Sequence, residues 1–338
     1  MGSIDRLDGR PSIAVSDATA TQDDGKDLTA VLANRRRRER LDFRITGTLQ
    51  KTANGAGLLN RGSILGAVAR LKFKVGRKTI VDIDARCARA ISEVMAKTQL
   101  AAVRAADAQI GNENLSELVS LFLARPNSLN PNETKYLDPP GENLTIEAVL
   151  QPNRRANLPG ILNAGAATLV NVAAQINDIY DEDTTRLPAY RTFVDEVTTA
   201  VIAAAQGALR MDLKLSRKVS GLLVQCDSDN GEVESLIQHM TLKTDRQTLI
   251  DNVVWTHYVE AQALEHGGAL GDTKAYAWID FQRYGRNTTW LDPVSEDTGL
   301  RFEFDVTPAG LTNPFIRVVP VQFERIAGAT APQLPVNG

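Results

Sequence analysis

The stretch Leu71–Asp82, LKFKVGRKTIVD, decides how this chain folds, because it returns as Met240–Asp251, MTLKTDRQTLID. In each stretch a run alternating apolar and polar residues enters a basic turn, and a second such run leaves it. Alternation with a period of two is typical of a half-buried strand, so each stretch predicts two strands joined by a turn. Arg77 in the first turn matches Arg246 in the second. The recurrence indicates a repeat within the chain.

Three further matches keep the same order along the chain, which is the signature of a tandem duplication. The spacing between partners falls from 170 residues (40 to 210) to 150 residues (168 to 318). Most of the fall lies where the first copy carries a longer stretch of helical character, residues 85–124. The matching pairs are Arg40–Thr46 with Arg210–Ser216, Tyr136–Leu150 with Trp290–Val306, and Thr168–Ile176 with Val318–Ile326.

The predicted fold class is dominated by β-structure: two tandem eight-stranded jelly-roll sandwiches with helical insertions. A doubly wound α/β fold would need regular alternation of strands and helices, which the sequence lacks. Helices are expected within 85–124 and, in the second unit, within residues 255–268. The predicted divisions are a flexible N-terminal arm (1–39) with one short helical turn at 28–32, a first jelly roll (40–180), a linker with a helix (181–207), a second jelly roll (208–328) and a C-terminal tail (329–338).

Composition and charge are those of an ordinary globular protein. A length of 338 residues suits two domains, and a net charge of -3 gives no overall attraction to nucleic acid. No apolar run approaches the ~20 residues of a membrane-spanning helix. The N-terminus also lacks the basic-then-apolar order of a secretory signal. Two cysteines, Cys87 and Cys226, are too few for a disulfide framework, and we expect both to be reduced residues of a core or boundary.

Residues that commonly carry catalysis are sparse in this sequence. The three histidines, His239, His257 and His266, all lie in the second unit and include no His-x-His pair of the kind that holds a metal in a bicupin-type enzyme. Nucleophile-elbow and phosphate-loop motifs are also missing. The acidic run Asp178–Asp183 lacks the glycine and spacing of a calcium loop, so we expect a solvated acidic linker there. We therefore predict no enzymatic activity, no cofactor and no metal.

The sharpest local charge in the sequence is the run of four arginines, Arg35, Arg36, Arg37 and Arg38. Placed at the root of a mobile arm, these side chains could neutralise phosphates of nucleic acid or of lipid headgroups. The alternative is a solvated charge run beside the first strand, screened at physiological salt. Both interpretations stay open on sequence grounds. Recognition of particular bases is disfavoured because no aromatic residues are interleaved with the arginines.

The duplicated sandwich resembles the double jelly-roll major capsid proteins of tailless icosahedral viruses, particularly those that infect bacteria. The resemblance rests on the two matched units, on the N-terminal arm, and on the strand, basic turn and strand of Leu71–Asp82 and Met240–Asp251. The end of the chain adds to it, with AWIDFQRYGRNTTWLDPVSEDTGLRFEFDVTPAG followed by FIRVVPVQFERI. The resemblance covers nearly the whole chain.

This resemblance implies a structural protein of the virion, assembled in the host cytoplasm. Copies of the chain would form pseudo-hexameric homotrimers, and neighbouring trimers would tile an icosahedral shell. Minor capsid proteins are further candidate partners. The arm would point inward, where its arginines could meet an internal membrane or the genome.

An alternative function is a tandem jelly-roll protein that binds carbohydrate or a receptor. Exposed aromatic residues such as Trp255, Tyr284 and Trp290 could then stack on sugars. Against this, Trp290 and Tyr136 occupy corresponding positions before the matched runs of the two units, which favours a structural corner over a binding site.

Overall fold

The structure of the chain is a computed structural model. It describes residues 10–16, 27–32, 37–54, 64–96, 109–123, 136–137, 144–150, 167–181, 190–213, 215–229, 231–281 and 299–325. Strands dominate these residues, and the α-helices among them are α1 (Ala85–Ala96) and α2 (Trp255–His266), of 12 residues each. Two short 3-10 helices, Ile64–Ala67 and Leu270–Asp272, accompany them. Within the described part of the chain no helix is long and apolar enough to cross a membrane.

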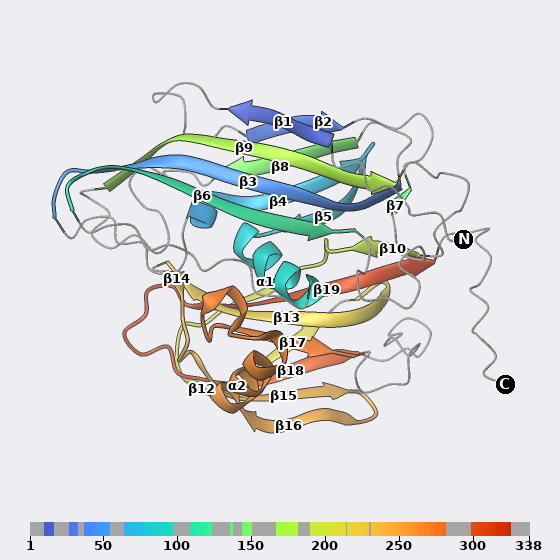
Figure 1. Cartoon of the computed structure of the whole chain (residues 1–338). Coiled ribbons are helices and arrows are strands. Elements are labelled where there is room, and N and C mark those ends of the chain that lie inside the picture. Colours follow the sequence, from blue (N-terminus) through green and yellow to red (C-terminus); the bar gives the residue numbers. More distant parts are fainter. Residues whose placement is uncertain are drawn as a thin grey trace.

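The first unit is a pair of antiparallel sheets, ordered β1-β9-β3-β6 and β2-β8-β4-β5, with the short β7 also paired to β3 (Figure 1). Setting β7 aside, the described strands occupy the places first, eighth, third and sixth in one sheet and second, seventh, fourth and fifth in the other. This is the order of a jelly roll. The bounds are β1 (Arg10–Ser16), β2 (Asp27–Leu32), β3 (Arg37–Lys51), β4 (Val68–Val75), β5 (Lys78–Ile83), β6 (Gly111–Phe122), β7 (Tyr136–Leu137), β8 (Leu144–Leu150) and β9 (Ala167–Asp181).

The second unit repeats this order. Its sheets run β10-β19-β13, with β17 and the short β14 also paired to β13, and β12-β18-β15-β16. Both β10 and β11 pair with β19, so together they take the place of the first strand. The bounds are β10 (Tyr190–Phe193), β11 (Thr198–Val201), β12 (Gln206–Leu213), β13 (Lys218–Ser228), β14 (Gly231–Glu232), β15 (Ile237–Thr244), β16 (Thr248–Val254), β17 (Tyr276–Asp280), β18 (Leu300–Val306) and β19 (Phe315–Arg325). The predicted pair of jelly rolls is thus confirmed.

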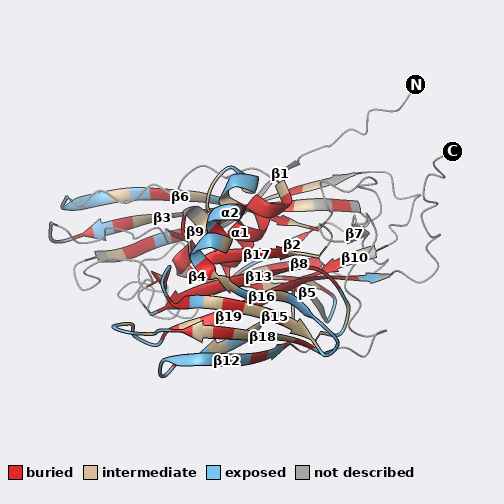
Figure 2. Ribbon diagram, turned by 90° about the horizontal axis from the view of Figure 1, so that it is seen from below, coloured by how far each residue is buried: buried red, intermediate tan, exposed pale blue. Residues whose placement is uncertain are grey.

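Each unit buries its own apolar side chains. Phe43 on β3 and Phe73 on β4 are almost completely buried in the first unit, as are Val224 on β13 and Phe302 on β18 in the second. Exposed residues gather at the strand tips, for example at the pale blue ends of β3 and β6 in Figure 2. Burial of such side chains, each contributing about 1.5–3 kcal/mol, is the main stabilisation of each sandwich.

Three of the four sequence matches join strands with the same place in the two units. Leu71–Asp82 spans β4 and β5, and Met240–Asp251 spans β15 and β16, which are the fourth and fifth strands of their units. One of the other correct matches leads into β8 and β18, and the second lies within β9 and, as far as Arg325, within β19.

The match between Arg40–Thr46 and Arg210–Ser216 is wrong by one strand. The first stretch lies in β3, the third strand of its unit, whereas the second begins in β12, the second strand. In both stretches an arginine pairs with the aspartate two residues later, at 3.1 Å from Nε to the nearer carboxylate oxygen. Strands at different positions in the jelly roll can both form this Arg–Asp pair, because residues i and i+2 lie on one face of any strand.

The N-terminal arm predicted over 1–39 is also wrong in part. Residues 10–16 form β1, which pairs with β9, and residues 27–32 form β2 rather than a helical turn and pair with β8. They are the first and second strands of the first jelly roll. Sequence periodicity missed them because an edge strand draws its backbone hydrogen bonds from a distant partner.

Two helix predictions need correction. The linker helix within 181–207 is replaced in the described residues by β10, β11 and the start of β12, because Thr198–Val201 pairs with β19 along the sheet edge. Within 85–124 only α1 is helical in the part described, and Leu115–Phe122 belongs to β6, paired along its length with β3. The second-unit helix is confirmed as α2, which ends at His266 and is followed by Gly267, whose left-handed φ of 77° glycine adopts without strain.

Candidate functional site

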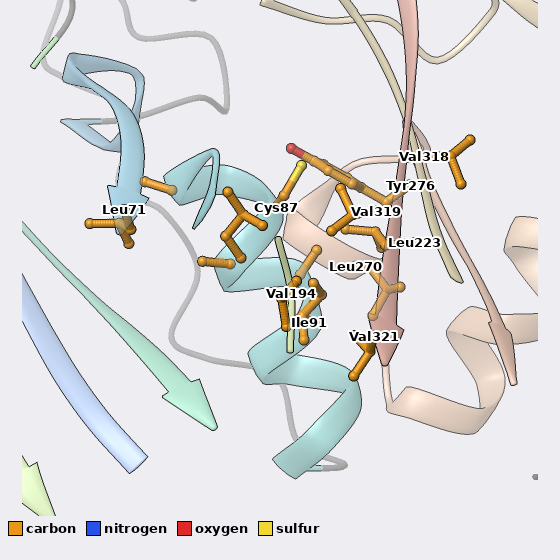
Figure 3. Close-up of a cluster of buried hydrophobic side chains, with 14 of the residues drawn as sticks. Leu71, Cys87, Ile91, Val194, Leu223, Leu270, Tyr276, Val318, Val319 and Val321 are labelled. Carbon is orange, nitrogen blue, oxygen red and sulfur yellow. The ribbon is translucent and has the colours of Figure 1, made fainter. Parts of the chain in front are cut away.

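Helix α1 lies between the two jelly rolls and is buried by both. It links β5 to β6, and all its residues except Ala96 are buried. Figure 3 shows Cys87 and Ile91 pointing from α1 toward Leu223 on β13 and Val319 on β19. The burial of β13 fits this position, because every residue after Lys218 in that strand is buried, as expected when both faces of a sheet are covered.

A cluster of buried charges fixes α1 to the second unit. The Arg86 guanidinium lies 2.5 Å from Asp227, 3.3 Å from Asp84 and 3.5 Å from Glu232. Arg317 on β19 lies 3.3 Å from Asp84 and donates a hydrogen bond of 2.8 Å to Gln225. The cluster therefore holds three carboxylates against two guanidinium groups. We call these residues the joint; they are Asp84, Arg86, Gln225, Asp227, Glu232 and Arg317.

Two opposing effects set the pKa values of the joint: burial disfavours the charged form of each group, and the ion pairs favour it. Burial raises the pKa of Asp227 to about 6, because Arg86 only partly offsets it and Glu232 and Asp84 add negative charge nearby. Burial also raises the pKa of Asp84, but Arg86 and Arg317 together bring it below its ordinary value. The pKa of Arg86 stays well above its usual range, because its carboxylate partners outweigh the burial that lowers it. Buried charges of this kind persist only while each keeps its partner.

Polar groups beside the joint satisfy one another and offer no reactive group. The Cys87 thiol donates a hydrogen bond of 3.0 Å to Gln225 Oε1, and Gln225 Nε2 donates one of 3.1 Å to the Tyr276 hydroxyl. Burial raises the pKa of the Cys87 thiol to about 12, so it stays a neutral thiol and a poor nucleophile. Both Cys87 and Cys226 are buried free cysteines, as predicted.

Further contacts hold the two units together away from the joint. Val194, just after β10, forms a parallel bridge with Val81 on β5 through backbone hydrogen bonds of 2.8 and 2.9 Å. The backbone N–H of Gly271 donates to Glu93 Oε2 on α1 at 2.7 Å. Lys78 on β5 pairs with Glu324 on β19 at 3.0 Å, although both side chains are about half exposed and this pair contributes little. The two jelly rolls therefore meet along a continuous boundary.

Of the four arginines that the sequence groups together, the structure describes the side chain of Arg38. Arg35 and Arg36 lie outside the described residues, and Arg37 is described only as a backbone position of β3. Arg38 is fully buried and forms two hydrogen bonds of 2.9 Å to the Asp178 carboxylate. For Arg38 the phosphate-contact prediction is wrong, and for Asp178 the solvated-linker prediction is wrong. The pairing of β3 with β9 brings them together across 140 residues, which no local pattern reveals.

The structure also describes some of the residues that the sequence analysis considered for sugar or metal binding. Trp255 has no exposed surface, and its indole N–H donates 3.0 Å to the carbonyl of Lys274, so it cannot stack on a sugar. Tyr284 and Trp290 lie outside the described residues. His239 on β15 lies 3.4 Å from Asp305 on β18, and His257 and His266 lie on α2. The described residues bring no three His, Cys, Asp or Glu side chains into a geometry for a metal ion.

Sequence reasoning missed the joint, although one signal of it was visible. The strand KVSGLLVQCDS places Gln225 and Asp227 two residues apart in an otherwise apolar run. Polar residues on one face of a strand that reads as buried on both faces indicate a buried partner. The partner itself, Arg86, is 141 residues away and could not be identified from the sequence.

Comparison with known proteins agrees with this architecture. No protein-family model and no curated protein matches the sequence. The fold matches the major capsid protein of Sulfolobus turreted icosahedral virus with a TM-score of 0.65 at 14% identity, over 92% of this chain and 95% of that one. It matches the major capsid protein of bacteriophage PM2 with a TM-score of 0.55 at 12% identity, over 94% and 98% of the chains.

A third match is the capsid of the virus PBCV-1, with a TM-score of 0.62 at 10% identity, over 94% of this chain and 93% of that one. These proteins come from viruses of different kinds, so the fold identifies no host. In each case the likeness covers more than nine-tenths of both chains. The chain has the double jelly-roll fold of viral major capsid proteins.

Proposed function

We propose that this chain is a major capsid protein, a non-enzymatic component of the virion whose copies assemble into an icosahedral shell. The observation that carries the proposal is the match of both jelly rolls, in one chain and in one mutual arrangement, to capsid proteins over more than nine-tenths of the length. The joint adds a physical reason. A shell subunit must keep the angle between its two sandwiches fixed, and buried paired charges resist a change of angle because separation would leave them without partners.

The finer proposal is a homotrimer in which six jelly rolls form a pseudo-hexagonal block, with neighbouring trimers and minor capsid proteins as partners in the shell. Support comes from the repeat itself. Two units of the same strand order offer similar surfaces, and three chains can close into a ring of six similar contacts. A bacterial host remains a prediction of the sequence resemblance.

The solution mass of the purified chain tests this proposal, measured by light scattering with negative-stain images of the same peak. One chain has a mass of 36.7 kDa, so a closed trimer is expected at about 110 kDa. Compact hexagonal particles or spontaneous shells are the expected images. A monomer at every concentration, with no larger particle, would contradict the proposal, and assays against a panel of sugars would then test the carbohydrate-binding alternative.

We also propose that Arg35, Arg36 and Arg37 contact phosphates of an internal membrane or of the genome. The support is their sequence alone, three adjacent cations at the beginning of β3 and just ahead of it. Replacing all three with alanine is expected to weaken salt-sensitive binding to anionic vesicles or to nucleic acid. Unchanged binding to both would overturn this assignment while leaving the capsid role intact.

A further inference from the structure

Helices α1 and α2 occupy the same place in their units, since each follows the fifth strand and precedes the sixth. Aligning their first residues, Ala85 with Trp255, puts Ser92 opposite Gln262. These two side chains make the same contact: Ser92 donates to the carbonyl of Ser120 on β6, and Gln262 donates to the carbonyl of Trp278 on β17. Strands β6 and β17 are both sixth strands. The alignment is therefore supported by hydrogen bonds as well as by topology.

Each helix has a second face, opposite the one that carries Ser92 or Gln262, and this second face is buried on α1 and exposed on α2. On α1, Cys87 and Ile91 point at the second unit, and Val94 continues the same face at helical spacing. The aligned residues of α2 are His257, Ala261 and Leu264, and all three are exposed. Leu264 is 88% exposed, whereas Val94 is 8% exposed. We call His257, Ala261 and Leu264 the α2 stripe.

The sheets that could receive these helices differ in the same way. In the second unit, the outer face of β13, β19 and β17 is covered by α1 and is buried at Leu223 and Val319. In the first unit, β3, β9 and β6 hold the corresponding places, yet part of their outer face is exposed, whereas Asp42 and Ser120 toward one end of it are buried. We call the exposed part the first-unit sheet face and define it by Arg44 on β3, Ser116 and Leu118 on β6, and Gln175 on β9.

One folded chain thus contains a complete contact between a helix of the first unit and a sheet of the second. It also presents both halves of the reverse contact, uncovered and on different units. The α2 stripe and the first-unit sheet face cannot meet within one chain, because α2 is held on its own sandwich through Trp255, Val259 and Gln262. A head-to-tail contact between copies can join them, and such contacts form rings when the rotation closes.

We propose that the α2 stripe packs against the first-unit sheet face of a second copy of this chain. The contact repeats, between chains, the one that α1 makes within a chain. It rests on the proposed assembly of copies and assigns the surfaces that meet in it. The residues suit such a role: an apolar side chain, Leu264, stands among polar neighbours on the helix, and Leu118 stands among polar neighbours on the sheet. Small apolar centres with polar rims are typical of contacts between folded subunits.

Charge substitution at each surface tests the contact in the full-length chain. The variants are Leu264→Asp on the stripe and Leu118→Asp on the sheet face, and the control is Val31→Asp on β2. Val31 is 60% exposed and lies in the other sheet of the first unit, outside both surfaces. All three positions are exposed, so thermal unfolding of the monomer is expected to change little. Light scattering over a concentration series then measures association.

Leu264→Asp and Leu118→Asp are each expected to raise the concentration needed for association by roughly tenfold or more, and Val31→Asp to leave it as in the unchanged chain. Wild-type association of either test variant would overturn this contact alone, since assembly itself would persist. Equal weakening by the control would also overturn it, because the effect would not depend on the site. An unchanged chain that never associates would instead overturn both this contact and the proposed function.

Discussion

Helices α1 and α2 stand at the same point of two duplicated sandwiches, yet α1 is buried almost throughout and α2 buries only Trp255, Val259 and Gln262. Each helix uses one face to close its own sandwich between the fifth and sixth strands. They differ on the second face, because α1 is covered there by the other jelly roll, whereas the corresponding face of α2 is exposed in this chain. The position of a duplicated helix is therefore set by its own unit, whereas the burial of its second face depends on whether another unit packs against it.

The sequences of the two helices have followed these environments. At the second position α1 has Arg86, surrounded by three carboxylates, and α2 has the exposed Thr256. Farther along, α1 pairs Arg89 with Glu93 at 3.2 Å in a buried setting, where α2 has Val259 against its own core. Buried charges with partners supply directional contacts that apolar packing lacks, at a cost in desolvation. The joint is therefore a device for fixing orientation more than for adding stability.

The largest effect that tests this comparison is expected from Arg86→Ala. Removing the guanidinium leaves the buried carboxylates of Asp227 and Glu232 without their shared cation. We expect this loss to lower the free energy of unfolding by about 3–5 kcal/mol. The matched control is Thr256→Ala at the aligned position of α2, expected to stay within about 0.5 kcal/mol. Urea unfolding followed by circular dichroism measures both.

Equal losses for Arg86→Ala and Thr256→Ala would break the comparison, because the two positions would then be energetically alike. A small loss for Arg86→Ala alone would mean that the joint rearranges, with Arg317 taking over the carboxylates that Arg86 leaves. A second transition in the unfolding curve of Arg86→Ala would identify the boundary between the jelly rolls as the part that opens first.

Much of the fold was predictable from the sequence because its information is local and repeated. The β4–β5 stretch and its copy β15–β16 carry period-two alternation around a basic turn, and a repeat of such a unit implies a repeat of the fold. Helix α2 was predictable from its spacing and from the glycine that ends it. The signals for these elements come from residues close to one another in the sequence.

The missed elements depend on residues far away in the chain. Strands β1 and β2 pair with β9 and β8, respectively. Their own sequences have too little apolar–polar alternation to predict that they are strands. Arg38 looked like a surface cation because its partner, Asp178, lies in another run of charges that also looked like surface. Local patterns assign both runs to solvent, whereas the ladder between β3 and β9 makes them neighbours in a buried pair. Side-chain partners across a sheet are set by strand register, which one sequence does not specify.

A smaller effect, dependent on pH, comes from the carboxylate that Arg86 faces. The pKa of Asp227 is raised to about 6 by burial in the folded chain, whereas an unfolded aspartate titrates near 3.9. As pH falls from about 7 to about 4.5, the folded state takes up this proton before the unfolded state does. This group therefore destabilises the folded state above about pH 6, and the penalty is relieved as pH falls. Asp84 acts in the opposite sense, because its pKa lies below the ordinary value.

Asp227→Asn separates the two contributions, because it removes the titration of Asp227 and leaves Asp84 in place. Relative to the variant, the unchanged chain is expected to gain about 1–3 kcal/mol of unfolding free energy between about pH 7 and about pH 4.5. Urea unfolding at both pH values measures this gain, and Thr256→Ala, which titrates nothing, is the control. A difference that is the same at both pH values would mean that Asp227 keeps its charge throughout, held by Arg86. The joint would then be fully ionised, and its rigidity would not vary with acidity.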